Sequence, residues 1–200
     1  PIANNITFHH ACERLFNLTL TPRCQAIRTI CAELARIQDH LLCVGAAALD
    51  LGAMTAFLFG FNEREAIYDL IEEISGSRFH PSFTRVGGLM QDMPPEWPAH
   101  VKAFCKKLPA ALDDVEALLN RNRIFIERTK GIGYLSAEDA IAWGWTGPLA
   151  RASGVRRDLR KDEPYLCYAD NWDGKGSSGV DFKVPISRGG DCLARYLVRL

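Results

Sequence analysis

The chain has 200 residues, of which 48% are hydrophobic and 24% are charged, the balance of an ordinary globular protein. Its 24 Lys and Arg residues equal its 24 Asp and Glu residues, so the formal net charge is zero and the sequence indicates no nucleic-acid partner. The seven cysteines form no CxxC pair, which argues against a zinc site or a disulfide framework and favours buried thiols in a reducing compartment.

Two helices are predicted in the first part of the chain. Residues 1–20 indicate a helix of roughly 12 residues, in which the adjacent His9 and His10 point about 100° apart. We interpret these histidines as surface or packing residues, because metal-binding pairs on a helix sit four residues apart. Thr21 followed by proline predicts the start of a second helix. Its apolar residues recur at helical spacing, and charged residues such as Arg28 lie off this stripe, on a face expected to be solvated or at an interface.

Residues 41–61 form an apolar run of 21 residues with a single charge, Asp50. Burial of a lone carboxylate raises its pKa, and raised pKa values are typical of functional sites. The run is also compatible with a membrane span, or with a core helix whose acid is satisfied by a neighbour. Gly45 and Gly52 allow close packing against another helix or a break before Asp50.

The next helix is predicted to begin with Asn62 as its N-cap and to end at Gly76. Residues 77–95 then read as an irregular loop with a glycine pair and several prolines. Binding and catalytic residues are often found on such loops. We therefore expect a functional site here, although a plain surface turn is an equal alternative. The charged candidates in this loop are Arg78, His80 and Arg85.

The second half of the chain contains three further helix signals. Residues 96–122 predict a long structural helix that Pro109 could kink. Ser136 is positioned to cap a short helix, and another helix should begin near Asp191.

Residues 144–165 are rich in glycine and arginine, with acidic residues interspersed, a mixture that favours ion-pair docking to another chain. Residues 170–180 read as a flexible polar insertion. We expect residues 1–200 to form a single partial domain. Its predicted parts are a helical core (1–143), a loop-rich docking region (144–187) and the start of a further helix (188–200), incomplete at both ends.

Several blocks of the sequence closely resemble the quinone-site (49 kDa) subunit family of respiratory complex I, NADH:ubiquinone oxidoreductase. The resemblance extends in order and spacing from about Asn4 to Arg199. It implies a mainly α fold, a helical bundle of the nickel–iron hydrogenase large-subunit type. The blocks are ALDLGAMTAFLFGFNERE, SGSRFHPSFTRVGGLMQD, NRNRIFIERTKGIG, RASGVRRDLRKDEPY and VPISRGGDCLARY.

The resemblance implies roles for three residues. Asp50 matches the family's quinone-pocket acid, which helps to supply or rearrange protons. His80 matches the histidine beside the terminal 4Fe-4S cluster, which a neighbouring subunit holds. Arg85 matches an arginine of the same loop, which adds positive charge near that cluster. A charged motif that includes Arg188 is expected to be structural.

The same resemblance implies a subunit of a proton-translocating oxidoreductase that is not catalytic alone. Ubiquinone is the implied substrate, this chain holds no metal, and NAD binds to another subunit. The implied partners are the other complex I subunits, above all the one that carries the terminal cluster, and a second chain that supplies the missing part of this subunit. The implied location is the matrix-side arm at the mitochondrial inner membrane, or alternatively the cytoplasmic face of a bacterial membrane.

Some positions depart from the family pattern. The family usually has threonine and histidine where this chain has Ala46 and Ala47, proline in place of Ala56 and histidine in place of Met90. The first change puts the proton network around Asp50 in doubt. Two alternatives therefore stay open: a structural subunit that kept the fold without an active site, and a hydrogenase-like large subunit, whose nickel–iron centre requires two CxxC pairs.

Overall fold

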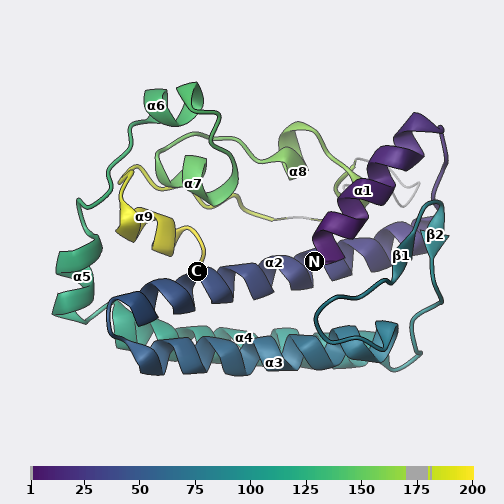
Figure 1. Cartoon of the computed structure of the whole chain (residues 1–200), viewed down its shortest axis with the longest axis horizontal. Helices are drawn as coiled ribbons and strands as arrows, with labels where there is room; N and C mark the ends of the chain where they lie inside the picture. The colour runs from purple at the N-terminus through teal and green to yellow at the C-terminus, as the bar shows by residue number, and fades with distance from the viewer. Residues whose placement is uncertain (1, 170–179, 181) are drawn as a thin grey trace.

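A computed structural model of the chain describes residues 2–169, 180 and 182–200, and three long helices dominate it. Helices α2 (Pro22–Asp50), α3 (Met54–Ser75) and α4 (Trp97–Leu119) run side by side, and α1 (Ile2–Leu15) lies across one end of α2 (Figure 1). The predicted mainly helical fold is confirmed.

The remaining elements are short. The α6–α9 region lies on the side of α2 opposite to α3 and α4 (Figure 1). Strand β1 (Thr84–Arg85) pairs antiparallel with β2 (Gly88–Leu89), so the loop predicted to be wholly irregular contains a small hairpin. The other elements are α5 (Arg123–Thr129), α6 (Ala137–Ala142), α7 (Gly147–Ala152), α8 (Leu159–Asp162), the 3-10 helix η1 (Leu166–Tyr168) and α9 (Cys192–Leu197).

Four predicted helix ends are confirmed by their capping contacts. Thr21 Oγ1 accepts a hydrogen bond of 3.3 Å from Cys24 N–H at the start of α2. Ser136 and Asp191 accept equivalent bonds at the starts of α6 and α9. Gly76 ends α3 with φ of 70°, a left-handed conformation that glycine adopts without a steric penalty.

The apolar run at 41–61 does not form one element. Helix α2 ends at Asp50, and the chain turns through Gly52, whose φ is 91°. Helix α3 already begins at Met54, so the prediction that Asn62 caps it is wrong. None of the helices in the described part of the chain is both long and apolar enough to cross a membrane.

Helices α2 and α3 approach closely where glycine faces the partner helix. A Cβ placed on Gly45 would lie 3.4 Å from Phe57 Cα, and one on Gly60 would lie 3.5 Å from the Leu41 carbonyl oxygen. The close packing predicted at Gly45 is therefore confirmed. Helix α4 continues through Pro109 and covers α3. The apolar core lies among these helices and includes Ile27, Leu34, Leu41, Ile67, Ile74, Trp97 and Phe104.

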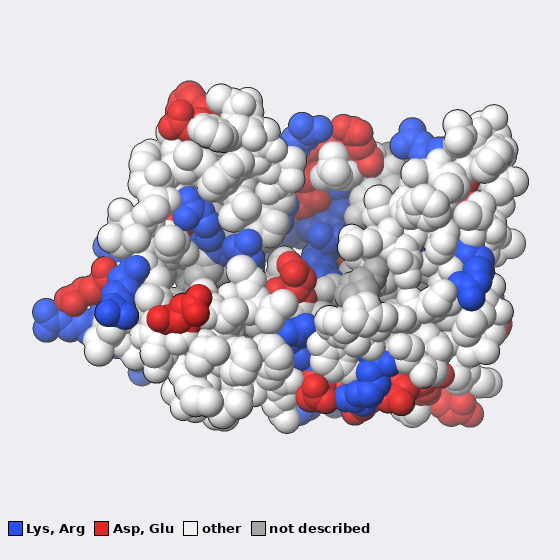
Figure 2. Space-filling model, viewed as in Figure 1, with Lys and Arg blue, Asp and Glu red and all other residues white. Residues whose placement is uncertain are grey.

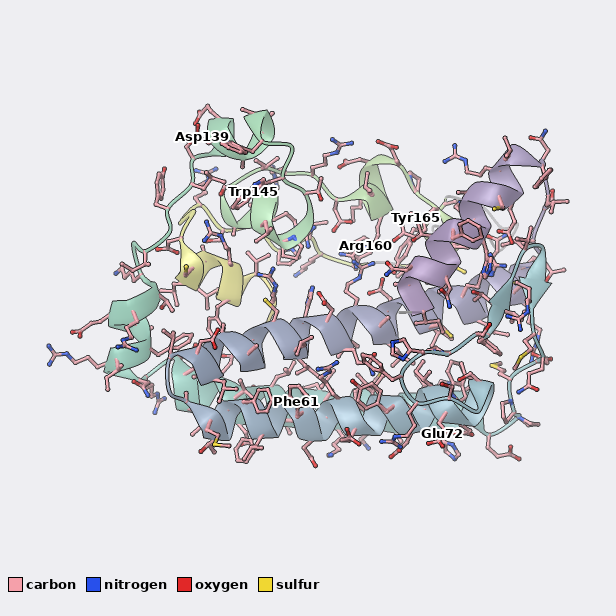
Figure 3. The ribbon with its side chains drawn as sticks, in the orientation of Figure 1. Phe61, Glu72, Asp139, Trp145, Arg160 and Tyr165 are labelled. Carbon is pink, nitrogen blue, oxygen red and sulfur yellow. The ribbon has the colours of Figure 1, made fainter. Side chains whose placement is uncertain are left out.

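Several charged residues of the predicted docking region form ion pairs within this chain. Asp158 binds both Arg151, at 3.2 Å, and Arg160, at 2.7 Å. Arg160 points from α8 toward α2 (Figure 3), where its Nη1 lies 3.4 Å from Glu33 Oε2. Helices α7 and α8 bring the partners of Arg151 and Arg160 close within the chain, and docking of this region onto another chain stays a prediction. The polar insertion lies outside the described residues, apart from Val180.

Candidate functional site

The structure places all three predicted site residues, Asp50, His80 and Arg85, at the surface. Asp50 is the last residue of α2 and is exposed, so the prediction of a buried carboxylate is wrong in this chain. The reason is positional: the apolar run breaks directly after Asp50, which leaves the side chain at the end of the bundle rather than in its centre. His80 and Arg85 are exposed in the loop that follows α3.

Asp50 is well separated from His80. Asp50 lies just before the first residue of α3, Met54, whereas the loop of His80 contacts α3 at Tyr68, through Phe79. Met54 and Tyr68 are fourteen residues apart on the same helix, which corresponds to about 21 Å along the helix axis. The structure therefore brings His80 and Arg85 into one loop and leaves Asp50 at a second location.

His80 is held by aromatic contacts. Its ring meets the Phe79 ring edge-on at 4.4 Å between centroids. Phe79 in turn meets Tyr68 of α3 at 5.8 Å, and the Tyr68 hydroxyl accepts a 2.8 Å hydrogen bond from Arg64 Nη2. This series of contacts connects the exposed His80 to a buried arginine in the middle of α3.

The Arg85 side chain folds back over its own loop. Its Nη1 donates to the carbonyl oxygens of Ser82, at 2.6 Å, and Thr84, at 3.0 Å. The guanidinium group therefore stays beside the hairpin, and its positive charge is available at the surface.

A buried ion pair between α1 and α2 fixes the backbone of this hairpin. Glu13 and Arg28 are 2% and 0% exposed, and two hydrogen bonds of 2.8 Å join them. Arg28 Nη2 also donates to the carbonyl oxygens of Arg85, at 2.6 Å, and Gly88, at 2.8 Å. The Gly87 N–H donates to Glu13 Oε1 at 2.7 Å. Both ends of the tight turn are thus bonded to one buried pair.

This environment affects the ionisation of Glu13. Burial acts to raise the pKa of the Glu13 carboxyl, but the hydrogen bonds from Arg28 and the Gly87 N–H, with the charge of Arg28, lower it overall. Glu13 is therefore held in its charged form, which is the form that Arg28 requires.

Sequence reasoning missed this pair. Arg28 was expected on a solvated or interface face, and the structure buries it completely. The only signal in the sequence is that Glu13 and Arg28 carry opposite charges on successive helices. Many residues of opposite charge on successive helices form no pair, so this signal does not identify the contact. The packing role predicted for His9 is confirmed, since its Nδ1 lies 2.8 Å from Thr84 Oγ1 of β1. Burial and the nearby charge of Arg28 lower the pKa of His9.

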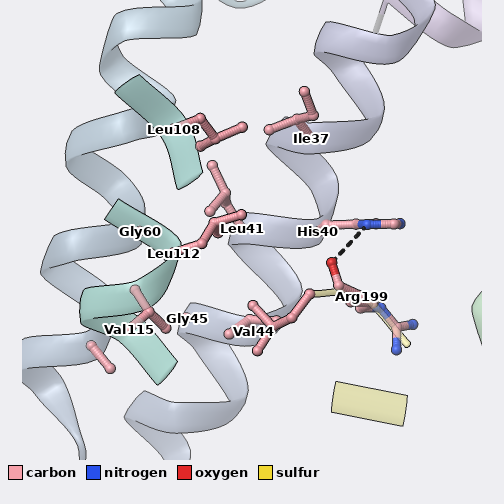
Figure 4. Close-up of a pocket in the computed structure, with 12 residues that line it drawn as sticks. Ile37, His40, Leu41, Val44, Gly45, Gly60, Leu108, Leu112, Val115 and Arg199 are labelled. Carbon is pink, nitrogen blue, oxygen red and sulfur yellow. Dashed lines mark hydrogen bonds between the residues drawn. The ribbon is translucent and has the colours of Figure 1, made fainter. Parts of the chain in front are cut away.

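A small apolar cavity of about 200 Å³ lies between α2, α3 and α4 (Figure 4). Leu41, Val44 and Leu112 line it, and at its edge His40 Nδ1 lies 3.2 Å from the Arg199 carbonyl oxygen. Asp50 is not among its lining residues. Sites for drug-sized ligands usually measure roughly 300–1,000 Å³, so this cavity is too small for such a ligand. Across the described residues, no group of three or more His, Cys, Asp or Glu side chains is arranged to hold a metal ion.

Comparison with known proteins provides an independent view of these residues. A family model described as "Respiratory-chain NADH dehydrogenase, 49 Kd subunit" matches residues 50–200, which include His80 and Arg85 and begin at Asp50.

Three bacterial relatives match almost the entire chain. The D-type subunit 1 of NADH-quinone oxidoreductase from Opitutus terrae is 50% identical over 199 residues, which is 100% of this chain and 45% of that protein. The D-type subunit from Methylacidiphilum infernorum is 48% identical over 200 residues, 100% of this chain and 46% of that protein. The C/D-type subunit from Bdellovibrio bacteriovorus is 44% identical over 196 residues, 98% of this chain and 33% of that protein.

The chain spans about half the length of the curated D-type relatives it matches, and less of the C/D-type relative. The matched family region covers the hairpin, the turn at Asp50 and the capped helix at the C-terminal end of the described chain. The chain belongs to the family of the 49 kDa subunit of respiratory-chain NADH dehydrogenase.

Proposed function

We propose that this chain forms part of the quinone-reduction chamber of an NADH:quinone oxidoreductase. The observation that carries the proposal is the hairpin beside His80, which presents Arg85 at the surface while the buried Glu13–Arg28 pair fixes its backbone. A rigid, exposed, cationic loop suits a site that must hold a charged neighbour at a constant distance. The names of the relatives indicate the reaction, which is electron transfer from NADH to a quinone.

His80 and Arg85 are proposed to border the terminal 4Fe-4S cluster of a neighbouring subunit. Both side chains are exposed, so a partner can approach them directly. A histidine that hydrogen-bonds or carries charge next to such a cluster raises its reduction potential and couples that potential to a proton. The fixed positive charge of Arg85 would also raise the reduction potential of the cluster.

Asp50 is proposed to border the quinone headgroup and to help supply or rearrange protons. The surface around it favours an apolar partner, because Leu49, Met54 and Leu58 are 39%, 60% and 53% exposed. An acid at the edge of an apolar patch becomes more desolvated when a ligand or another polypeptide covers that patch.

The proposed partners are other subunits of the same complex. The Bdellovibrio bacteriovorus relative is named as both C and D type, which favours a protein of the C type as a close neighbour. The subunit that carries the terminal cluster is a second proposed neighbour, and the rest of the D-type subunit would complete the chamber. Because the relatives are bacterial, we propose the cytoplasmic face of a bacterial membrane rather than the mitochondrial location expected from sequence.

The substitution Asp50→Asn tests the proposal. In the native assembly it should lower NADH:quinone reductase activity by at least tenfold while NADH oxidation by an artificial acceptor such as ferricyanide is unchanged. The matched control is Asp69→Asn, which replaces an exposed carboxylate of α3 that pairs with Arg78 and should leave quinone turnover unchanged. Undiminished quinone turnover in the Asp50→Asn assembly would exclude the role given to Asp50 and favour a purely structural subunit.

A further inference from the structure

His80 is exposed, yet the residues on both sides of it are attached to helices. Pro81, which follows it, is buried, and its carbonyl oxygen accepts a 2.9 Å hydrogen bond from Asn5 Nδ2 of α1. Phe79, which precedes it, lies edge-on against the Tyr68 ring of α3, with 5.8 Å between the ring centroids. The loop therefore passes from α3 to α1 at His80, and each flank of this residue has its own attachment.

Tyr68 contacts both loop residues that precede His80. Besides Phe79, it contacts Arg78, whose guanidinium carbon lies 5.8 Å from the centre of the Tyr68 ring. The ring itself is held from within α3. Arg64 Nη2 donates a 2.8 Å hydrogen bond to the Tyr68 hydroxyl, and the Arg64 guanidinium lies 5.6 Å from the ring centre. Because Arg64 is 6% exposed, the ring that supports the loop is fixed to a buried side chain.

Arg78 adds an attachment of a different kind. Its guanidinium lies 2.5 Å from Asp69 and 2.6 Å from Glu65, and a third carboxylate, Glu72, lies at 3.2 Å. Acidic side chains gather along the edge of the molecule that the second half of α3 forms (Figure 2). These ion pairs are exposed, and exposed pairs contribute little and are screened by salt. The aromatic contact with Tyr68 is therefore the attachment that fixes the geometry of the loop.

We propose that Tyr68 is a positioning residue for His80: its ring supports Phe79 and thereby sets the direction in which the imidazole points. Aromatic rings prefer edge-on or offset arrangements, and the Phe79 and His80 rings also meet edge-on, at 4.4 Å. Two successive edge-on contacts thus relate the imidazole to helix α3. The inference rests on the proposed function in one respect, the placement of a 4Fe-4S cluster beside His80. The effect of a charge or hydrogen bond on that cluster depends on distance and direction, so the orientation of the imidazole affects the potential.

Two substitutions of Tyr68 separate the role of the ring from that of its hydroxyl. Tyr68→Leu and Tyr68→Phe both remove the oxygen that accepts from Arg64, but only Tyr68→Phe keeps a ring against Phe79. In the native assembly, Tyr68→Leu should lower the reduction potential of the terminal cluster by at least half of the drop that His80→Met produces. Tyr68→Phe should leave the potential close to the wild-type value. Electron paramagnetic resonance during a redox titration at a single pH measures all three.

The double variant Tyr68→Leu/His80→Met shows whether Tyr68 acts through His80. Its potential should equal that of His80→Met, because no imidazole is left for the ring to position. Effects that add in full would mean that Tyr68 acts through another group, such as Arg78, and would overturn the proposal. An unchanged potential in Tyr68→Leu, where His80→Met does lower it, would also overturn it. If Tyr68→Leu fails to assemble, Phe79→Leu removes the same contact from the exposed side and takes its place.

Hydrogen–deuterium exchange separates a failure of this inference from a failure of the proposed function. In the same assemblies, the backbone amides of Phe79, His80 and Ser82 should exchange faster in Tyr68→Leu than in the wild type and in Tyr68→Phe. If His80→Met leaves the potential unchanged, the proposed function fails. Faster exchange in Tyr68→Leu would then still support the positioning role of Tyr68, whereas unchanged exchange would overturn it as well.

Discussion

Arg28 Nη2 donates a 2.6 Å hydrogen bond to the backbone carbonyl of Arg85, although 57 residues separate them in the chain. This contact joins a fully buried arginine to an exposed one. It explains how a short two-stranded hairpin, which is marginal by itself, keeps a fixed position against the helices. The first predictions follow from this relationship.

The substitution Arg28→Met should destabilise the chain strongly. It leaves Glu13 charged and buried without its partner, a loss worth roughly 3–5 kcal/mol for buried ion pairs. The free energy of unfolding from urea denaturation provides the measurement. As a control, Arg123→Met removes only the exposed pair with Glu127 and should cost less than about 1 kcal/mol. Equal costs for the two substitutions would contradict the structural importance of the buried pair.

Stability should depend on the ionisation of Glu13 at low pH. Its folded-state pKa lies below the ordinary value of 4.5, so the stabilisation is fully present above that pH and is lost as the pH falls through the folded pKa. The stability difference between the wild type and Glu13→Gln should therefore be largest near neutral pH and shrink below about 4.5. A difference that stays constant from pH 7 to pH 3 would be inconsistent with a charged Glu13.

Replacement of His80 should remove a proton-coupled effect on the reduction potential of the cluster that we propose lies beside it. In the native assembly, His80→Met should abolish the pH dependence of the terminal cluster's reduction potential, followed by electron paramagnetic resonance during a redox titration. The control is His100 of α4, an exposed histidine 3.0 Å from Glu73 of α3, and His100→Met should leave the titration unchanged. A potential in His80→Met that still shifts with pH would argue against the placement of His80.

Two glycines should respond differently to alanine. A Cβ on Gly190 would lie 2.5 Å from the Leu135 carbonyl oxygen, and the φ of Gly190 is 65°, so Gly190→Ala should destabilise by at least roughly 1–3 kcal/mol. A Cβ on Gly45 would meet Phe57 at an ordinary contact distance of 3.4 Å. Helix propensity then favours alanine, and Gly45→Ala should be neutral or stabilising by up to about 1 kcal/mol. Thermal denaturation of both variants measures the contrast.

The helix ends were predictable because local chemistry determines them. Thr21, Ser136 and Asp191 each cap a helix through a contact a few residues along the chain, and Gly76 supplies the left-handed residue at the end of α3. Asn62 has the right residue type for a cap, but the turn at Gly52 starts α3 earlier, so its capping potential is not used.

The environment of the site residues could not be predicted from local pattern. The burial of Asp50 depended on whether the apolar run continued past Gly52, and the run breaks there. The burial of Arg28 depended on a hairpin that begins 56 residues later in the chain. Apolar residues that recur every 3.6 positions identify which side chains share a helix face. They do not identify which residues of a distant segment pack against that face.

The pairing of Glu13 and Arg28 also bears on how fast a partner can dock. Ordering a backbone residue costs roughly 1–2 kcal/mol of conformational entropy at room temperature. Since the hairpin is ordered within the isolated chain, that entropy is lost during folding rather than during association. Docking onto Arg85 can then proceed as a rigid-body encounter guided by charge, with little conformational rearrangement to slow it.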